Sequence, residues 1–142
     1  MTAIYEGGCL CGDLRYSITA EPVVQCYCCC STCQGATGAP AVSWIALRES
    51  GFKFTKGAPT SYESSPGVIR EFCGRCGTAV TYRNAGYPDD RFQRDALIAV
   101  TSSSLDDIEA FPPREVFHGD ELPSWIDPER LCPGALHHHE KP

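Results

Sequence analysis

The chain is 142 residues long, a length typical of a single domain. Hydrophobic residues make up 42% of it and charged residues 21%, which excludes a mainly disordered protein. A formal net charge of −6 argues against binding nucleic acid through a basic surface. No stretch approaches the roughly 20 apolar residues of a membrane span, and the first residues lack a signal-peptide pattern. We therefore expect a cytoplasmic protein with no membrane or nucleic-acid partner.

The first third of the chain predicts strands around one short helix. Apolar and polar residues alternate over Leu14–Thr19, which indicates a half-buried strand. A short apolar run, Val23–Tyr27, leads into a group of cysteines. Ser31–Thr37 then predicts a single helical turn that ends at Gly38. A central strand is expected over Ala41–Leu47.

The middle of the chain predicts two hairpins. Strands over Phe52–Thr55 and Ser61–Glu63 are separated by Gly57-Ala58-Pro59, a combination typical of a hairpin turn. Val68–Phe72 and Thr78–Tyr82 predict the two arms of a second hairpin, with a pair of cysteines at its turn.

The last part of the domain is expected to alternate between loops and strands. The polar segment Asn84–Arg94 predicts a loop, and Ala96–Thr101 predicts an apolar strand. Pro112-Pro113 interrupts the chain before Glu115–Phe117. With no repeat and no strong amphipathic helix, this pattern predicts an all-β fold in one domain.

We place that domain at residues 1–130 and expect residues 131–142 to form a disordered C-terminal tail. His137–His139 are expected in solvent rather than at a site, and Cys132 is expected to be unliganded. His118, the remaining histidine, is a candidate proton shuttle, although a surface position is the simpler expectation.

Ten cysteines are far more than a core of this size needs. Without an export signal the thiols should stay reduced, so dense cysteine indicates metal or redox chemistry rather than a disulfide scaffold. Nine of them fall in three short segments, which are 9–11, 26–33 and 73–76.

The first and last segments together predict a structural zinc site. Cys-x-x-Cys-Gly at residues 73–77 is a zinc-knuckle pattern, in which two thiolates come from one tight turn. A closed zinc site needs four ligands, and the pair at residues 9 and 11 supplies the other two. The predicted tetrahedral site is Cys9, Cys11, Cys73 and Cys76. A redox role for the Cys-x-x-Cys pair is the alternative, but it would need a βαβ context that the pattern lacks.

The middle segment predicts a second metal site. Cys28, Cys30 and Cys33 have the Cys-x-Cys-x-x-Cys spacing that lets three thiolates bind one zinc and leave the fourth position open, as in catalytic sites. Such a site would favour a soft ligand, above all another thiolate. The alternative is a second closed site, with Cys26 or Cys29 as the fourth ligand.

These segments resemble the motifs of one known family, in the same order and at similar separations. Gly8–Gly12 is similar to its opening motif, Cys28–Gln34 to its second and Phe72–Gly77 to its third, while Leu122–Trp125 resembles a late Pro-Trp element. Over roughly residues 4–126 the chain thus resembles the glutathione-dependent formaldehyde-activating enzymes. Two positions depart from the family pattern, because Cys29 stands where histidine is usual and Cys26 is additional.

The resemblance implies a β-tent fold of antiparallel sheets held by zinc, with two zinc ions per chain. It implies a structural zinc on the residues Cys9, Cys11, Cys73 and Cys76, and a catalytic zinc on Cys28, Cys30 and Cys33. The implied partners are glutathione, or a similar small thiol, and formaldehyde or a related small aldehyde. The implied reaction joins them, and it is classed as a carbon–sulfur lyase reaction in reverse.

A mechanism follows from such a zinc site. The metal would lower the pKa of a thiol substrate, and the resulting thiolate would attack the aldehyde carbon. Candidate donors to the aldehyde oxygen are Tyr27, Ser31 and Thr32. Candidate partners for substrate carboxylates are Arg48, Arg70, Arg75 and Arg83. Two other functions remain open: a glutathione-binding or carrier module without turnover, and a zinc scaffold in which both sites are closed.

Overall fold

The computed structural model describes residues 4–84 and 96–138, which form one mainly β domain. Its strands are β1 (Tyr5–Gly8), β2 (Arg15–Ile18), β3 (Val24–Cys28), β4 (Val42–Arg48), β5 (Phe52–Lys56), β6 (Thr60–Ser65), β7 (Val68–Phe72), β8 (Ala79–Asn84), β9 (Leu97–Thr101), β10 (Glu115–Phe117) and β11 (Leu136–His138). Its helices are short, and they are α1 (Ser31–Thr37), η1 (Glu49–Gly51), η3 (Ser102–Ser104), η4 (Gly119–Glu121) and α2 (Pro128–Leu131). The predicted all-β, single-domain fold is confirmed.

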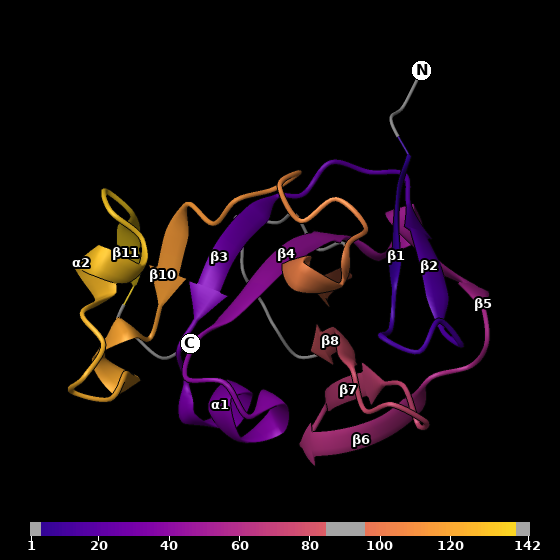
Figure 1. The fold of residues 1–142 in the computed structure, drawn as a ribbon, viewed down its shortest axis with the longest axis horizontal. Coiled ribbons are helices and arrows are strands. Elements are labelled where there is room, and N and C mark those ends of the chain that lie inside the picture. The colour runs from indigo at the N-terminus through magenta and orange to yellow at the C-terminus, as the bar shows by residue number, and fades with distance from the viewer. Residues whose placement is uncertain (1–3, 85–95, 139–142) are drawn as a thin grey trace.

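The described strands form two sheets. A three-stranded sheet has the order β1-β2-β5, and an eight-stranded sheet has the order β11-β10-β3-β4-β9-β8-β7-β6. Most neighbours are antiparallel, but β10 runs parallel to both β3 and β11. Figure 1 shows the small sheet at one end of the molecule and β10, β11 and α2 at the other, with α1 beside β3 and β4.

The main core lies between the two sheets. Ile45 and Leu47 of β4 are fully buried there, and they belong to the same apolar cluster as Tyr16 and Ile18 of β2. Side chains alternate between the faces of a strand, so the residues between these positions in β4 must face the other way. One face of the large sheet therefore closes the core against the small sheet.

The opposite face of the large sheet carries a second, smaller apolar cluster. Val42 and Trp44 of β4 pack there against Cys26 of β3 and Cys33 of α1. The strand register places Cys26 opposite Trp44 and Cys28 opposite Val42. The same alternation that builds the main core thus brings α1 and the middle cysteines together on this face.

One predicted hairpin is confirmed and the other is wrong. The strands β7 and β8 pair antiparallel on either side of the turn that holds Cys73 and Cys76. The strands β5 and β6 do not pair with each other, because β5 joins β2 in the small sheet while β6 joins β7 in the large one. The segment between them crosses from one sheet to the other.

The predicted tail differs from the structure over its described part. The strand β11, inside the expected tail, pairs with β10 along its whole length. His138 stacks on Phe117 with ring centroids 4.4 Å apart, and its Nε2 lies 2.8 Å from Glu115 Oε1. These two contacts of the His138 ring hold a segment that was expected from composition to lie in solvent. Residues 139–142 and most of the predicted loop over 84–94 lie outside the described residues.

Candidate metal centres

Two turns from different sheets bring the first group of cysteines together. One turn joins β1 to β2 and the other joins β7 to β8. The four sulfur atoms all lie within 4.8 Å of one another. We call this group the four-cysteine cluster, and its members are Cys9, Cys11, Cys73 and Cys76. The structure confirms the prediction from sequence that these four residues lie together.

Backbone amides in both turns point at sulfur. The Leu14 amide donates to Cys9 Sγ at 3.2 Å, and the Cys76 amide donates to Cys73 Sγ at 3.4 Å. Gly77 follows with φ 80°, a left-handed conformation that glycine adopts without strain. Hydrogen bonds of this kind favour the charged form of a thiol. Both turns are therefore built to present thiolates.

The four thiols do not ionise alike. Hydrogen bonds from the Thr78 side chain and backbone, with a further one from the Cys11 backbone, lower the pKa of Cys76 to about 5. A backbone hydrogen bond at Asp13 favours the Cys11 thiolate, but desolvation and the neighbouring cysteines outweigh it and raise its pKa to about 12. Like charges in one cluster oppose each other. Complete ionisation of the four thiols therefore calls for a bound cation.

The second group of cysteines lies where β3 passes into α1. Cys28 is the last residue of β3, Cys30 is the N-cap of α1 and Cys33 lies in the first turn of that helix. Their sulfur atoms lie within 4.8 Å of one another, and those of Cys28 and Cys30 are 3.5 Å apart. The Cys33 amide donates to Cys30 Sγ at 3.4 Å, so the sulfur caps the helix. We call these residues the three-cysteine cluster.

Neither Cys26 nor Cys29 belongs to that cluster. Cys29 is completely buried, and its amide donates to the Phe117 carbonyl, which fixes the backbone between Cys28 and Cys30. Cys26 packs in the apolar cluster behind α1. Burial raises the pKa of both thiols, that of Cys29 to about 11. Both side chains are thus packed as neutral thiols rather than gathered with the three sulfurs.

The three-cysteine cluster readily holds one negative charge. Hydrogen bonds from the Cys28 and Cys33 thiols lower the pKa of Cys30 to about 2. Hydrogen bonds to Cys30 and Cys33, with desolvation, raise the pKa of Cys28. Since each further thiolate would face the first across a few ångströms, a cation is again needed to ionise all three.

A histidine and a glutamate lie next to this cluster. His118 follows β10 and has φ 58°, the one positive φ outside glycine among the described residues. Its Nδ1 lies 3.4 Å from Glu121 Oε2, and both side chains are largely buried. Glu121 Oε1 accepts a hydrogen bond from the Ser31 amide at 3.3 Å, which ties η4 to the start of α1. The surface position expected for His118 therefore gives way to a sheltered one beside the cluster.

The four candidate arginines have different surroundings. Arg70 is buried and its guanidinium lies against Cys33 Sγ. Arg75 is exposed and paired with Asp13, whereas Arg83 pairs with both Glu71 and Glu49. Arg48 is exposed at the end of β4. Of the three hydroxyl candidates, Ser31 and Thr32 are exposed on α1 and Tyr27 is half-buried.

Sequence reasoning missed two features of this site. It did not single out Glu121, and it named Arg70 only as a candidate partner for substrate carboxylates, not as a neighbour of the cysteines. A sequence pattern could have indicated the position of Arg70. It pairs with Tyr82 across two predicted strands, and alternation places both residues on one face of the sheet. For Glu121 no local signal exists, because it reaches α1 across 90 residues of sequence.

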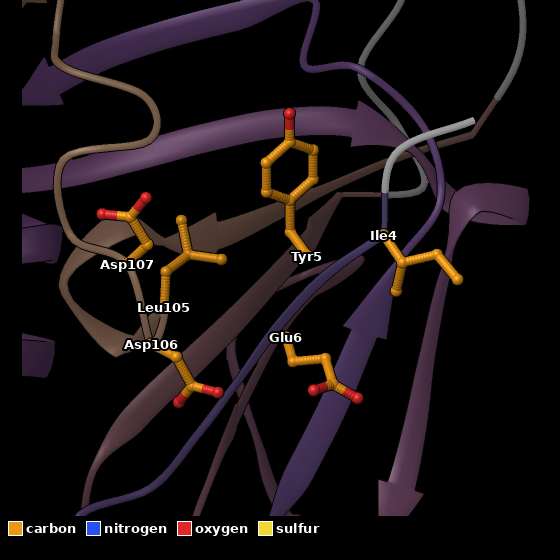
Figure 2. Close-up of a pocket in the computed structure, with 6 residues that line it drawn as sticks. All are labelled: Ile4, Tyr5, Glu6, Leu105, Asp106 and Asp107. Atoms are coloured by element: carbon orange, nitrogen blue, oxygen red, sulfur yellow. The ribbon is translucent and has the colours of Figure 1, made fainter. Parts of the chain in front are cut away.

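A cavity of about 520 Å³ lies away from both clusters. Figure 2 shows its lining, which comes from the start of β1 with the residue before it and from the segment after η3. The lining residues are Ile4, Tyr5, Glu6, Leu105, Asp106 and Asp107. No cysteine lines it, and its carboxylates form no group close enough to hold a metal ion among the described residues. Asp106 is paired with Arg15. The cavity therefore shares no residue with either cysteine cluster.

Fold and site together define a mainly β protein with two cysteine clusters, each of which could hold a metal ion. No described helix has the length and apolar character needed to cross a membrane. The chain belongs to the glutathione-dependent formaldehyde-activating enzyme family, whose model matches residues 4–120.

The fold also resembles a solved structure. A crystal structure of a Rhodobacter sphaeroides protein superimposes with a TM-score of 0.58 at 19% sequence identity, covering 94% of this chain and 98% of the other. At this identity the likeness concerns the fold alone. The comparison with curated proteins gave no match.

Proposed function

We propose that the protein is a zinc-dependent enzyme that joins a small thiol to a small aldehyde and splits the adduct in reverse, as a carbon–sulfur lyase. Glutathione and formaldehyde are the substrates that the family suggests. The proposal depends on one observation. The three-cysteine cluster brings together three sulfur atoms, and no fourth ligand atom from the described side chains joins them. Three protein ligands and a vacant position are the mark of a catalytic zinc site.

The donor set fits zinc at both clusters. Four sulfurs at 2.3 Å from a tetrahedral zinc lie roughly 3.8 Å from one another. The sulfur–sulfur distances are 3.6 Å for Cys9 and Cys11, 3.7 Å for Cys11 and Cys73, and 3.5 Å for Cys28 and Cys30. Thiolate ligands favour zinc over magnesium or calcium. We assign a structural zinc to the four-cysteine cluster and a catalytic zinc to the three-cysteine cluster.

When bound, zinc supplies the positive charge that lets a substrate thiol ionise near neutral pH. In the adduct-forming direction a carbon–sulfur bond forms at the aldehyde carbon, and the aldehyde oxygen gains the proton that the thiol loses, so no redox partner is needed. His118 is the residue to hold and move this proton at Nε2, since its Nδ1 side faces Glu121. Glu121, held by the Ser31 amide, orients the ring.

The ten free thiols support a reducing compartment such as the cytoplasm as the place of this activity. Acting there, the four-cysteine cluster keeps the two sheets together while the three-cysteine cluster meets the substrates.

The decisive experiment combines metal analysis with NMR detection of the adduct. The wild-type protein should bind two zinc ions per chain and speed the equilibration of glutathione with ¹³C-formaldehyde. Cys30→Ser should lose one zinc and the activity while keeping the fold. Cys132→Ser is the matched control, because its sulfur lies outside both clusters and donates to the Pro113 carbonyl at 3.5 Å. Two zinc ions in Cys30→Ser would refute the site, whereas glutathione binding without turnover in the wild type would make the protein a carrier.

A further inference from the structure

A buried arginine lies directly behind the three-cysteine cluster. Arg70 of β7 is only 8% exposed, and both Nη1 and Nη2 lie 3.8 Å from Cys33 Sγ. Its Nε donates to Ser64 Oγ at 3.0 Å, and its Cζ lies 5.0 Å from the centre of the Tyr82 ring. Four contacts thus fix the guanidinium with its two terminal nitrogens aimed at one sulfur atom.

Such an arginine needs an anion. Its guanidinium is always charged, and a buried charge without a counter-charge is costly. Ser64 and Tyr82 offer a hydroxyl and an aromatic face, neither of which is an anion at neutral pH. Within residues 4–84 and 96–138, no carboxylate forms an ion pair with Arg70. Cys33 Sγ is therefore the group whose negative charge this arginine is placed to meet.

The neighbouring arginines differ from Arg70. Arg83, on the next strand, is neutralised by Glu71 and Glu49. Arg75, beside the four-cysteine cluster, is exposed and donates to the carboxylate of Asp13. Among the described side chains, Arg70 at the three-cysteine cluster is the one arginine whose guanidinium donates to a sulfur atom.

We propose that Arg70 is a positioning residue of the three-cysteine centre, where it holds Cys33 Sγ in its ligand geometry and neutralises the metal-loaded site. This inference rests on the metal site of the proposed function. Three thiolates and one divalent cation carry a net single negative charge, and the guanidinium brings the sum to zero. The fourth sulfur ligand of a closed site would restore a negative charge, as would a substrate thiolate.

The charge balance has a consequence for substrate. An incoming thiolate would meet a centre that is neutral rather than anionic, and in a partly buried site this difference is screened less than on the open surface. Arg70 therefore favours an anionic soft ligand at the vacant position without touching that ligand. Its effect should appear in metal affinity, in the electronic spectrum of the site and in thiolate binding.

The test uses anaerobic Co²⁺ titration of the full-length, metal-free protein, since Co²⁺ gives sulfur-to-metal charge-transfer bands. In Arg70→Met the three-cysteine site should bind Co²⁺ roughly 10–100-fold more weakly, as is typical when a group behind a metal ligand is lost. Its charge-transfer band should move to longer wavelength, because sulfur loses two hydrogen-bond donors and a nearby positive charge. Arg70→Lys, which keeps the charge without the two-pronged contact, should recover part of the affinity.

The four-cysteine site is the internal control for folding, and Arg75→Met is the matched control for removing an arginine beside a cysteine cluster. The four-cysteine site in Arg70→Met and both sites in Arg75→Met should keep wild-type Co²⁺ affinity. Wild-type affinity and band position at the three-cysteine site in Arg70→Met would overturn the proposal. If Arg70→Met fails to fold, Arg70→Lys decides, and an unchanged affinity and spectrum there would equally overturn it. A wild-type protein that binds two metal ions but lacks activity would refute the proposed enzyme and leave the role of Arg70 standing.

Discussion

The sulfur atom of Cys11 lies 3.7 Å from that of Cys73, although 62 residues separate them in the chain. Cys11 belongs to the turn of the small sheet and Cys73 to a turn of the large one. A metal ion bound between them would therefore link the two sheets across the edge of the main core. The three-cysteine cluster, by contrast, draws all its sulfur atoms from one short segment.

This difference predicts unequal costs for losing the two proposed metal ions. Cys73→Ser should lose one metal ion and most of the about 5–15 kcal/mol of unfolding free energy that a domain of this size possesses. Cys30→Ser should lose one metal ion with a much smaller effect, since α1 stays attached to β3 through the chain. Thermal unfolding followed by circular dichroism, with metal analysis of each variant, measures both. Equal losses of stability would contradict the linking role of the four-cysteine cluster.

The position of Cys26 outside the three-cysteine cluster predicts a clear contrast between neighbours on one strand. Cys26→Ala should keep two metal ions per chain and cost about 1 kcal/mol through lost packing. Cys28→Ala should keep only one metal ion. Metal analysis after dialysis against a weak chelator distinguishes the two variants. If Cys26→Ala loses a metal ion while Cys28→Ala does not, the assignment of ligands on β3 is incorrect.

A close approach of β1 to its neighbours predicts that Gly7 tolerates no side chain. A Cβ atom there would lie 2.3 Å from Tyr16 Oη and 2.4 Å from the Ser104 carbonyl oxygen. Gly7→Ala should lower the free energy of unfolding by about 1–3 kcal/mol, measured by urea denaturation. Gly35→Ala is the matched control, because nothing lies within 4 Å of its added Cβ. It should stabilise the protein by roughly 0.5–1 kcal/mol through helix propensity, and a loss equal to that of Gly7→Ala would exclude the steric explanation.

The ion pair between Arg15 and Asp106 predicts a small pH dependence of stability. The Arg15 side chain lowers the pKa of Asp106 below the ordinary value of 3.8. A carboxyl whose pKa falls on folding adds stability above its unfolded pKa, and this contribution disappears as the pH falls through the folded pKa. Both side chains are partly exposed, so the pair is worth at most about 1 kcal/mol.

The test compares the wild type with Asp106→Asn at two pH values. At pH 7 the variant should be less stable by a few tenths to about 1 kcal/mol. At pH 4 the difference between the two urea midpoints should be smaller, because the unfolded carboxyl is then partly protonated. Taking the difference between the proteins removes the contribution of thiol protonation, which both share. A difference as large at pH 4 as at pH 7 would mean that Asp106 acts through something other than its charge.

Local patterns predicted most of the elements that hold the clusters. The hairpin of β7 and β8, the short helix over Ser31–Thr37 and its end at Gly38 are all present. These features depend on residues a few positions apart, whose side-chain directions follow from backbone geometry. The prediction of a hairpin from β5 and β6 is wrong because the chain crosses between the two sheets there. Gly57, at φ 73°, lies close to the Asp13 carbonyl at this crossing. A glycine-proline turn signal does not reveal which sheet follows it.

By itself, the sequence determined the mainly β fold, the spacing of the cysteines and the resemblance to the family that the chain proved to belong to. The tertiary structure alone decided that β11 completes the large sheet, that Cys26 and Cys29 stay outside the three-cysteine cluster, and that Arg70 lies buried against Cys33. Short-range spacing fixes which thiols of one turn can meet. The choice of partner across tens of residues depends on how two sheets and their faces pack, and no local pattern carries that information.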